Sequence, residues 1–165
     1  MPTQDPVTEL QPEFSSDDAA PTDWETAREH LEKADVYWLS TVRPEGRPHV
    51  TPMVAVWLDG ALYFSTSSVS ERKAKNLAQN PHCALTTGNN ILNEGLDLVI
   101  EGDAERVSDE NMLQLLADSF ATKYGEEWRG RFIGDGGNVA MVFKVAPATA
   151  FGFDKGALSQ TRWRF

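Results

Sequence analysis

Residues 36–66 read VYWLSTVRPEGRPHVTPMVAVWLDGALYFST, and this stretch contains the pattern that decides the fold. Aromatic and β-branched residues at 36–42 and 48–58 predict two strands, separated by the turn sequence Pro44-Glu45-Gly46. Asp59-Gly60 then predicts a tight hairpin turn, after which the chain returns as a third strand. Three consecutive strands joined by short turns form an antiparallel meander.

The remaining sequence extends this pattern. Further β-rich segments are 82–87, 96–107, 139–145 continuing through 149–153, and 159–165. Three segments predict helices, which begin at Thr22, Ser70 and Ser108 as N-caps. Several short strands in a meander favour a barrel over a parallel sheet. We therefore expect a mainly β (α+β) fold with six to seven antiparallel strands in a barrel and flanking helices.

The first 21 residues differ from the rest. They contain four prolines and five acidic residues but no lysine or arginine, and those acids account for half of the net charge of -10. Such a composition buries too little apolar surface to offset the entropy of ordering. The sequence predicts a disordered acidic tail at 1–21 and one domain at 22–165.

Composition excludes several classes of function. The chain has 15 basic and 25 acidic side chains, which argues against a nucleic-acid partner. Cys83 is the only cysteine, so no intramolecular disulfide and no cysteine-built metal site can form. No long apolar segment or signal peptide stands out, so we expect a cytoplasmic location and no membrane partner.

The most informative segment runs from the predicted strand end at Thr66 into the next helix. A loop rich in hydroxyl groups, including Ser67, precedes the adjacent cations Arg72 and Lys73. A helix start carries unpaired N–H groups and partial positive charge, so this pattern suits a phosphate group. On spacing alone, an ordinary solvent-exposed helix start explains the segment equally well.

Two other patterns are less specific. Alternation in the last predicted strand places Arg162 and Arg164 on one face, which is as typical of a plain surface as of a binding cleft. The three histidines show no metal-ligand or triad spacing, and His49 fits a packed or surface residue better than an acid–base group. We expect no bound metal and identify no catalytic side chain.

The order of several motifs resembles the pyridoxamine 5'-phosphate oxidase-like family, the flavin and deazaflavin oxidoreductases with a split β-barrel. The similar pieces are Leu39-Ser40-Thr41, Gly46-Arg47-Pro48, Val50-Thr51-Pro52-Met53, Leu62-Tyr63-Phe64-Ser65-Thr66, Ser70 to Leu77, Asn80-Pro81, Glu101-Gly102-Asp103-Ala104 and Thr161 to Phe165. Together they span about residues 24–165.

The resemblance implies a noncovalently bound FMN or F420 and a homodimer with the cofactor site at the subunit interface. It implies that Arg72 and Lys73 bind the cofactor phosphate together with Thr66 and Ser67. It also implies that a strand lines the ring system through its backbone and that a late arginine reaches across the dimer. The residues that correspond are Val50, Thr51, Pro52 and Met53 for the strand, and Arg162 for the arginine.

Two departures from the family matter. The Arg-Leu-His run that holds substrate in true pyridoxamine phosphate oxidases is replaced by Leu158-Ser159-Gln160, so vitamin B6 oxidation is not expected. A glutamine that touches the flavin in those enzymes corresponds to Asp97, whose carboxylate would be unfavourable beside a reduced ring. Because of the second departure, the deazaflavin F420 is a candidate cofactor in addition to FMN.

The resulting hypothesis is an FMN- or F420-dependent oxidoreductase that transfers a hydride between the cofactor and a small organic substrate. Because the cofactor carries the hydride, the absence of a triad is compatible with it. The alternatives are a non-catalytic module that binds or stores a flavin or haem-type cofactor, and an interaction domain without a ligand.

Overall fold

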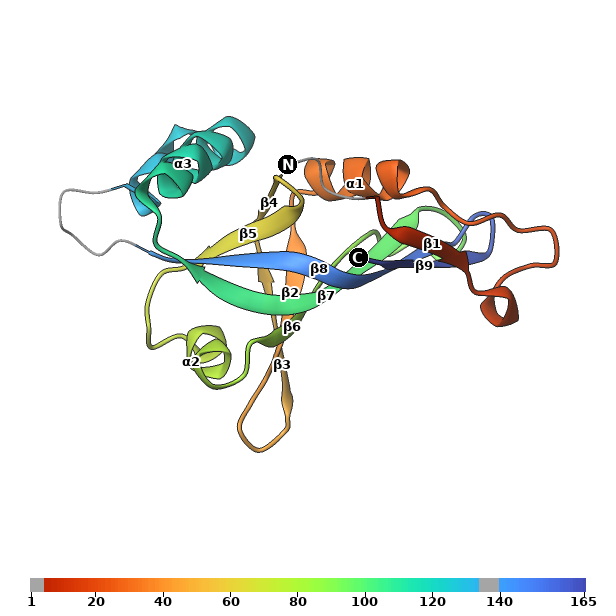
Figure 1. The fold of residues 1–165 in the computed structure, drawn as a ribbon, viewed down its shortest axis with the longest axis horizontal. Coiled ribbons are helices and arrows are strands. Elements are labelled where there is room, and N and C mark those ends of the chain that lie inside the picture. Colours follow the sequence, from red (N-terminus) through yellow and green to blue (C-terminus); the bar gives the residue numbers. More distant parts are fainter. Residues whose placement is uncertain (1–4, 134–139) are drawn as a thin grey trace.

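The computed structural model describes residues 5–133 and 140–165. Within them, nine strands form one curled antiparallel sheet in the order β1-β9-β8-β7-β6-β2-β3, to which β4 and β5 are joined by pairing of β5 with β8 (Figure 1). The strands are Val7–Leu10 (β1), Tyr37–Val42 (β2), Pro48–Met53 (β3), Val56–Leu58 (β4), Ala61–Thr66 (β5), His82–Thr87 (β6), Leu96–Val107 (β7), Met141–Asp154 (β8) and Ser159–Arg164 (β9). The mainly β, antiparallel fold class is confirmed.

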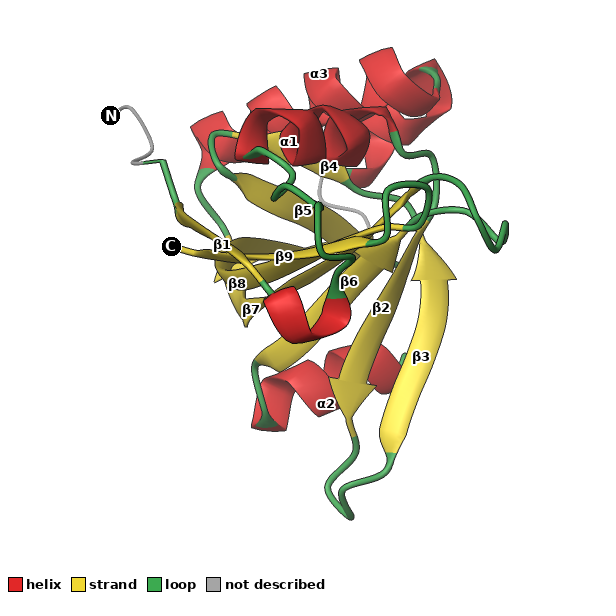
Figure 2. Ribbon diagram, turned by 90° about the vertical axis from the view of Figure 1, so that its right-hand side faces the viewer, coloured by secondary structure: helices red, strands yellow, loops and turns green. Residues whose placement is uncertain are grey.

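The helices lie on both sides of the sheet. They are α1 (Trp24–Lys33), α2 (Arg72–Gln79) and α3 (Glu110–Tyr124), with short 3-10 turns at Pro12–Phe14 (η1) and Glu126–Arg131 (η2). Figure 2 shows α1 and α3 on one side of the sheet and α2 on the opposite side. None of the helices in the described ranges is both long and apolar enough to cross a membrane.

The pairing of β7 with β8 is the longest in the sheet. One edge of β8 pairs with β7 from residue 142 to residue 154, with one residue skipped at Ala148. Its other edge pairs with β5 at 141–145 and with β9 at 149–154. Pro147, which has no N–H to donate, lies between those two partners. Opposite it the register shifts between Glu101 and Gly102, where a β-carbon on Gly102 would lie 2.4 Å from the Ala146 carbonyl oxygen. This bulge bends the sheet and requires glycine.

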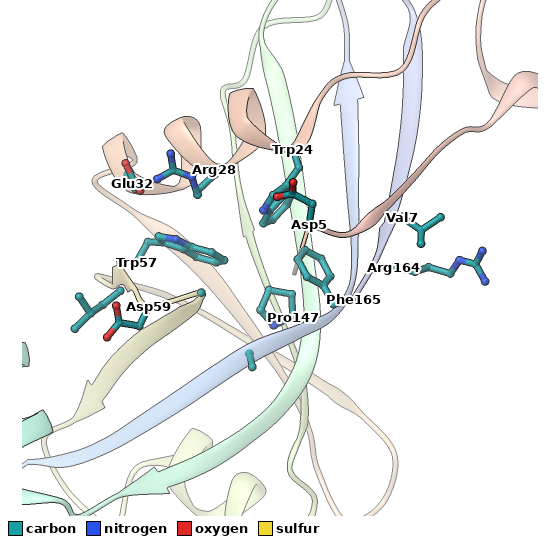
Figure 3. A pocket seen from close by; sticks show the side chains of 13 residues that line it. Asp5, Val7, Trp24, Arg28, Glu32, Trp57, Asp59, Pro147, Arg164 and Phe165 are labelled. Atoms are coloured by element: carbon teal, nitrogen blue, oxygen red, sulfur yellow. Dashed lines mark hydrogen bonds and ion pairs between the residues drawn. The ribbon is translucent and has the colours of Figure 1, made fainter. Parts of the chain in front are cut away.

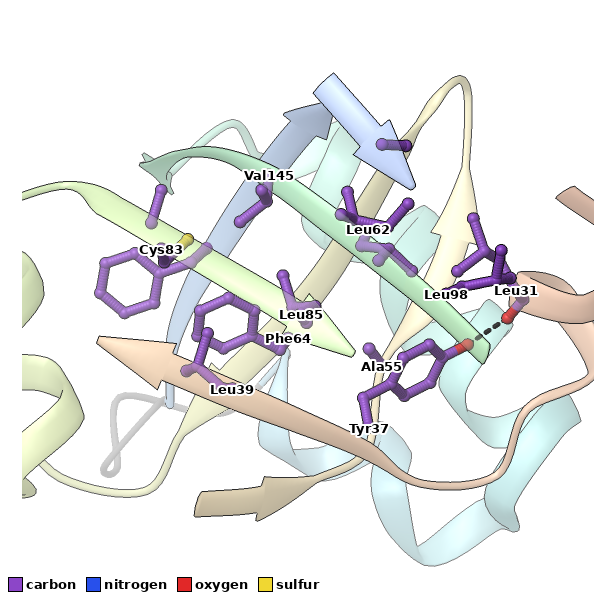
Figure 4. Packing of buried hydrophobic residues seen from close by; sticks show 14 of the residues in the cluster. Leu31, Tyr37, Leu39, Ala55, Leu62, Phe64, Cys83, Leu85, Leu98 and Val145 are labelled. Carbon is purple, nitrogen blue, oxygen red and sulfur yellow. Dashed lines mark hydrogen bonds between the residues drawn. The ribbon is translucent and has the colours of Figure 1, made fainter. Parts of the chain in front are cut away.

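Two apolar clusters fill the fold. The larger lies inside the curl and includes Tyr37, Phe64 and Trp163, and Figure 4 shows Tyr37 donating a hydrogen bond to the Leu31 carbonyl of α1. The smaller, which includes Phe120, packs α3 against β4 and β5. The larger cluster fastens α1 through Leu31 and α2 through Leu77, and the smaller fastens α3. Burial of such side chains contributes about 1.5–3 kcal/mol per residue.

The number of strands exceeds the predicted six to seven. The segment expected as one strand at 48–58 divides into β3 and β4, because β3 pairs with β2 whereas β4 pairs with β5. Two expected segments, 139–145 and 149–153, instead form the single strand β8 from Met141; residue 139 lies outside the described residues.

The N-terminal segment differs from the predicted disordered tail. From residue 7 it forms β1, which pairs antiparallel with β9 from Val7 with Arg164 to Leu10 with Thr161. The side chain of Glu9 forms ion pairs with Arg162 and Arg164. The composition predicted disorder because the segment cannot build its own core, but the open edge of β9 supplies hydrogen-bond partners and positive charge from the far end of the chain. Residues 1–4 lie outside the described residues.

Lys123 on α3 is a partly buried cation that fastens this helix to the sheet. Its Nζ donates to the Ala55 carbonyl oxygen at 2.9 Å and to the Tyr37 hydroxyl at 3.3 Å. It also lies 5.2 and 5.1 Å from the ring centres of Tyr37 and Tyr124. Burial lowers the pKa of Lys123 to about 8, and distant Asp35 and Glu32 only partly oppose this.

We expect Lys123 to make the folded protein more stable as the pH rises from 8 to 10. In this window the folded state releases the Lys123 proton while the unfolded state, with the ordinary lysine pKa, still binds it, so the free energy of unfolding increases with pH. Cys83 and Tyr124, whose pKa burial raises to about 12, act in the opposite direction in this window. Urea unfolding at pH 7, 8, 9 and 10 would therefore measure the Lys123 contribution as the difference between wild type and variant. The variant Lys123→Met should lose it, and Lys33→Met on the exposed face of α1 should keep it. An equal increase in Lys123→Met would contradict the assignment.

Candidate functional site

A cluster of polar and cationic side chains lies where β5 ends and α2 begins. The chain leaves the sheet at Thr66, passes through a loop, and enters α2 with Arg72 and Lys73 in its first turn. Asn76 anchors the helix, because its Nδ2 donates to the Thr41 hydroxyl of β2 at 2.9 Å and both side chains are only 1% exposed. The orientation of the α2 start is therefore set from inside the fold.

Four buried polar atoms in this region have no hydrogen-bond partner among the described residues. Asn76 Oδ1 on α2 can only accept, whereas three others can donate: Thr66 Oγ1 at the end of β5, His49 Nδ1 on β3 and Arg43 Nε just after β2. Thr66 is 1% exposed. Buried polar atoms nearly always have partners, so three unpaired donors in one region suggest that a ligand supplies the missing acceptors.

Three cations of this region act on the titration of His49. Burial lowers the pKa of His49, and the positive charges of Arg43, Arg72 and Lys73 lower it further. His49 is therefore mostly neutral at pH 7, and the two arginines and the lysine make the surrounding potential positive. An anion in this region would be stabilised by all of them.

One carboxylate already lies among these groups. Glu71 accepts hydrogen bonds from the backbone N–H groups of Ser67 at 2.5 Å and Ser68 at 3.1 Å, and it forms an ion pair with Lys73. Burial opposes its ionisation, but Lys73 and the two N–H groups lower the pKa of Glu71 below its usual value. The loop thus binds a carboxylate, which demonstrates its capacity to bind an anion. Arg72 has no ion-pair partner within 5–133 and 140–165.

Most of the residues predicted from the sequence lie in this part of the fold. Thr66, Ser67, Arg72 and Lys73 surround the start of α2, and His49 places β3 beside them. On β3, exposure alternates, so that Val50 and Pro52 face outward while Thr51 and Met53 face inward. Among the described strands β3 pairs only with β2, which leaves its outer backbone edge free for another partner.

Arg162 is not brought to this cluster within a single chain. It lies on β9, which is separated from β3 by four strands in the sheet order. Its guanidinium is occupied by Glu9, with Nε at 3.0 Å and Nη2 at 2.5 Å from the same carboxylate oxygen. The hydrogen bonds and charges of Arg162 and Arg164 lower the pKa of Glu9, so the pairing persists at neutral pH.

Sequence reasoning missed Arg43 and His49 as members of the cluster. The sequence pattern suits a packed or surface His49, and it gives no reason to single out Arg43. The available signal was the alternation along β3, which puts His49 on the same inward face as Thr51 and Met53. Its closeness to Arg72 depends on the packing of α2 against β2, which no local pattern reports.

Asp97, the second departure from the family's sequence pattern, is paired with a cation of its own chain. Its carboxylate lies 3.1 Å from Lys155 Nζ and accepts a hydrogen bond from the backbone N–H of Asn89. These contacts fasten the loop after β6 to the turn after β8. The carboxylate therefore serves a structural contact within the chain.

A separate hollow of about 920 Å³ lies beside α1 and the β4–β5 turn (Figure 3). Aromatic rings form one wall, with the centre of Trp24 lying 5.9 Å from that of Trp57 and 4.8 Å from that of Phe165. Its rim mixes acids and bases, including Asp59, Arg28 and Arg164. None of the residues in the α2 cluster lines this hollow.

The curled sheet with one helix start placed against it defines the class of this protein, the split β-barrels. The sequence pattern of the family described as pyridoxamine 5'-phosphate oxidase matches residues 24–152. The chain belongs to this family, as the motifs predicted. A search of curated proteins found no significant match.

Solved structures share the fold at low sequence identity. A conserved hypothetical protein from Mycobacterium tuberculosis is 18% identical with a TM-score of 0.74, covering 87% of this chain and 91% of that one. The haem storage protein HutZ from Vibrio cholerae is 20% identical with a TM-score of 0.63, covering 75% and 89%. An FAD-binding protein from Mesorhizobium loti is 16% identical with a TM-score of 0.61, covering 94% and 98%.

The Asn76–Thr41 bond should be a measurable part of the stability of the α2 cluster. Asn76→Ala leaves the buried Thr41 hydroxyl unpaired, which costs about 1–3 kcal/mol of unfolding free energy. Urea denaturation would measure this loss. The double variant Thr41→Val with Asn76→Leu removes both polar groups and should recover most of it. No recovery in the double variant would show that packing at Asn76, and not the hydrogen bond, stabilises this contact.

Proposed function

We propose that the protein is an oxidoreductase that binds a phosphate-bearing flavin or deazaflavin, FMN or F420, and transfers a hydride between it and a small organic substrate. One observation carries the proposal: cations and unpaired buried donors gather at the start of α2 in a protein whose net charge is -10. Such a local excess of donors suits a phosphate.

Each group has a role in binding. Arg72 and Lys73 hold the phosphate, with Thr66 and Ser67 donating to its oxygens and Arg43 and His49 extending the positive potential. The ring system lies along the free outer edge of β3, against the backbone of Val50, Thr51, Pro52 and Met53. The bound cofactor supplies the hydride chemistry; the protein positions it and excludes water.

The substrate is not a vitamin B6 phosphate. At the position of the missing substrate-holding run, Ser159 is only 4% exposed, and its hydroxyl donates to the Ala20 carbonyl oxygen at 2.6 Å. Leu158 sits in a turn with φ of 52°. Neither side chain offers the charge that a pyridoxal phosphate would require.

We further propose a homodimer with the cofactor site at the subunit interface. Trp38 on β2 is 49% exposed and Val50 on β3 is 53% exposed, and both lie on the outward side of this sheet edge. An exposed tryptophan beside an exposed valine supports burial by a second copy. In such a dimer Arg162 of the partner subunit would reach the cofactor, which a single chain does not allow.

The double variant Arg72→Ala with Lys73→Ala tests the binding site. Each charge-assisted hydrogen bond contributes about 1.5–3 kcal/mol, so the affinity for FMN and F420 should fall at least about 100-fold, while the circular dichroism spectrum stays the same. Fluorescence titration of both cofactors would measure this. Arg28→Ala with Lys33→Ala removes the same charges from α1 and should bind normally. Unchanged affinity in the first double variant would refute the assignment.

His49 should make binding depend on pH. The phosphate dianion raises the lowered pKa of His49, so binding takes up a proton, and affinity for FMN should increase as the pH falls from 8 to 6.5. His49→Gln should flatten this dependence, which isothermal titration at several pH values would record. If the affinity of wild type and of His49→Gln for FMN changes equally with pH, His49 does not interact with the phosphate.

A second candidate is a non-catalytic haem-binding or storage module. The observation that favours it is His82 on β6, whose exposed ring donates through Nδ1–H to a carboxylate oxygen of Asp103 at 2.5 Å. A carboxylate in this position orients an imidazole and leaves Nε2 free for iron. A Soret band that appears with haem and disappears in His82→Ala would favour this function. Reduction of a bound flavin by a substrate would favour the oxidoreductase.

A further inference from the structure

Glu71 has an unusual position at the start of α2. It is the N-cap residue, yet its side chain accepts no capping hydrogen bond from a backbone N–H of the first turn of the helix. Instead it turns back to the preceding loop, where one carboxylate oxygen accepts from the N–H groups of both Ser67 and Ser68. A capping role therefore does not explain where this carboxylate lies.

The partners of Glu71 are the donors that an external anion would use. Two adjacent backbone N–H groups bind one oxygen, and Lys73 forms an ion pair with the other. Lys73 is 14% exposed and Glu71 is 29% exposed, so both side chains are largely withdrawn from solvent. Paired N–H groups beside a cation are a typical anion-binding concavity.

The buried Thr66 hydroxyl, next to this concavity, forms no hydrogen bond with Glu71. Thr66, which directly precedes Ser67, is 1% exposed and its hydroxyl has no partner among the described residues. Arg72 likewise has no ion pair within those residues. One carboxylate, tied to its own chain, thus satisfies part of a site that has donors for a larger anion with more oxygens.

We infer that the Glu71 carboxylate is an internal competitor for the phosphate site, and that a phosphate-bearing ligand binds by displacing it. The charge of Glu71 then repels a bound phosphate until the side chain swings out. The consequence is an affinity held low enough for the ligand to exchange, as a cofactor that leaves after each turnover requires. The identity of the cofactor rests on the proposed function, whereas the competition for a phosphate group does not.

The variant Glu71→Gln tests this inference, because it keeps the size of the side chain and removes its charge. Dissociation constants for inorganic phosphate and for FMN, measured by isothermal titration, should each decrease about tenfold relative to wild type, which corresponds to about 1.4 kcal/mol. Glu110→Gln removes the same charge from the start of α3 and should bind like wild type. In the wild-type protein, the amide NMR signals of Ser67 and Ser68 should shift as inorganic phosphate is added.

The results separate this inference from the proposed function. Tighter phosphate binding by Glu71→Gln, with no FMN binding by either protein, supports the competitor and refutes the flavin proposal. Equal affinities of wild type and Glu71→Gln for both ligands, or weaker binding by the variant, overturns the competitor and shows that Glu71 only shapes the loop. If Glu71→Gln does not fold, unshifted Ser67 and Ser68 signals in the wild type overturn it instead.

Discussion

The pairing of β7 with β8 is the constraint on which the other elements depend. Along one edge β8 pairs with β7. Along its other edge the first part of β8 pairs with β5 and the last part pairs with β9, so β8 connects the β4–β5 hairpin to the rest of the sheet. The bulge at Gly102 opposite Pro147 curls the sheet between those two parts of β8. The curl encloses the larger apolar cluster and leaves the end of β5, and with it the start of α2, beside the β2–β3 hairpin.

The start of α2 is locally positive, although the chain as a whole carries a net negative charge. Acids outnumber bases by 25 to 15, yet Arg43, Arg72 and Lys73 lie close enough together to lower the pKa of His49. Like charges held in one place cost stability unless an opposite charge compensates them. Glu71 supplies part of that compensation within the chain, and unpaired buried donors remain in the same region of the fold. The fold therefore maintains a site that is electrostatically incomplete.

The N-terminal strand adds a second connection between charge and architecture. Glu9 on β1 binds both arginines of β9, so the segment with the most acidic composition neutralises the most basic strand end. The same pairing covers an edge of the sheet that would otherwise be open. For this reason Arg162 belongs to the surface of its own chain, and any role at a cofactor requires the partner subunit and competition with Glu9.

The sequence by itself determined the features that depend on neighbouring residues. Alternation predicted most strands, Asp59-Gly60 predicted the β4–β5 turn, and the succession of Thr66, Ser67, Arg72 and Lys73 predicted a helix start suited to an anion. Only the tertiary structure decided what depends on distant partners. Residues 7–10 form a strand because the open edge of β9 supplies their hydrogen-bond partners. His49 lies near Arg72 because α2 packs against β2. The physical reason is that hydrogen-bond partners and charges far apart in the chain act on a residue only once folding has brought them within a few ångströms.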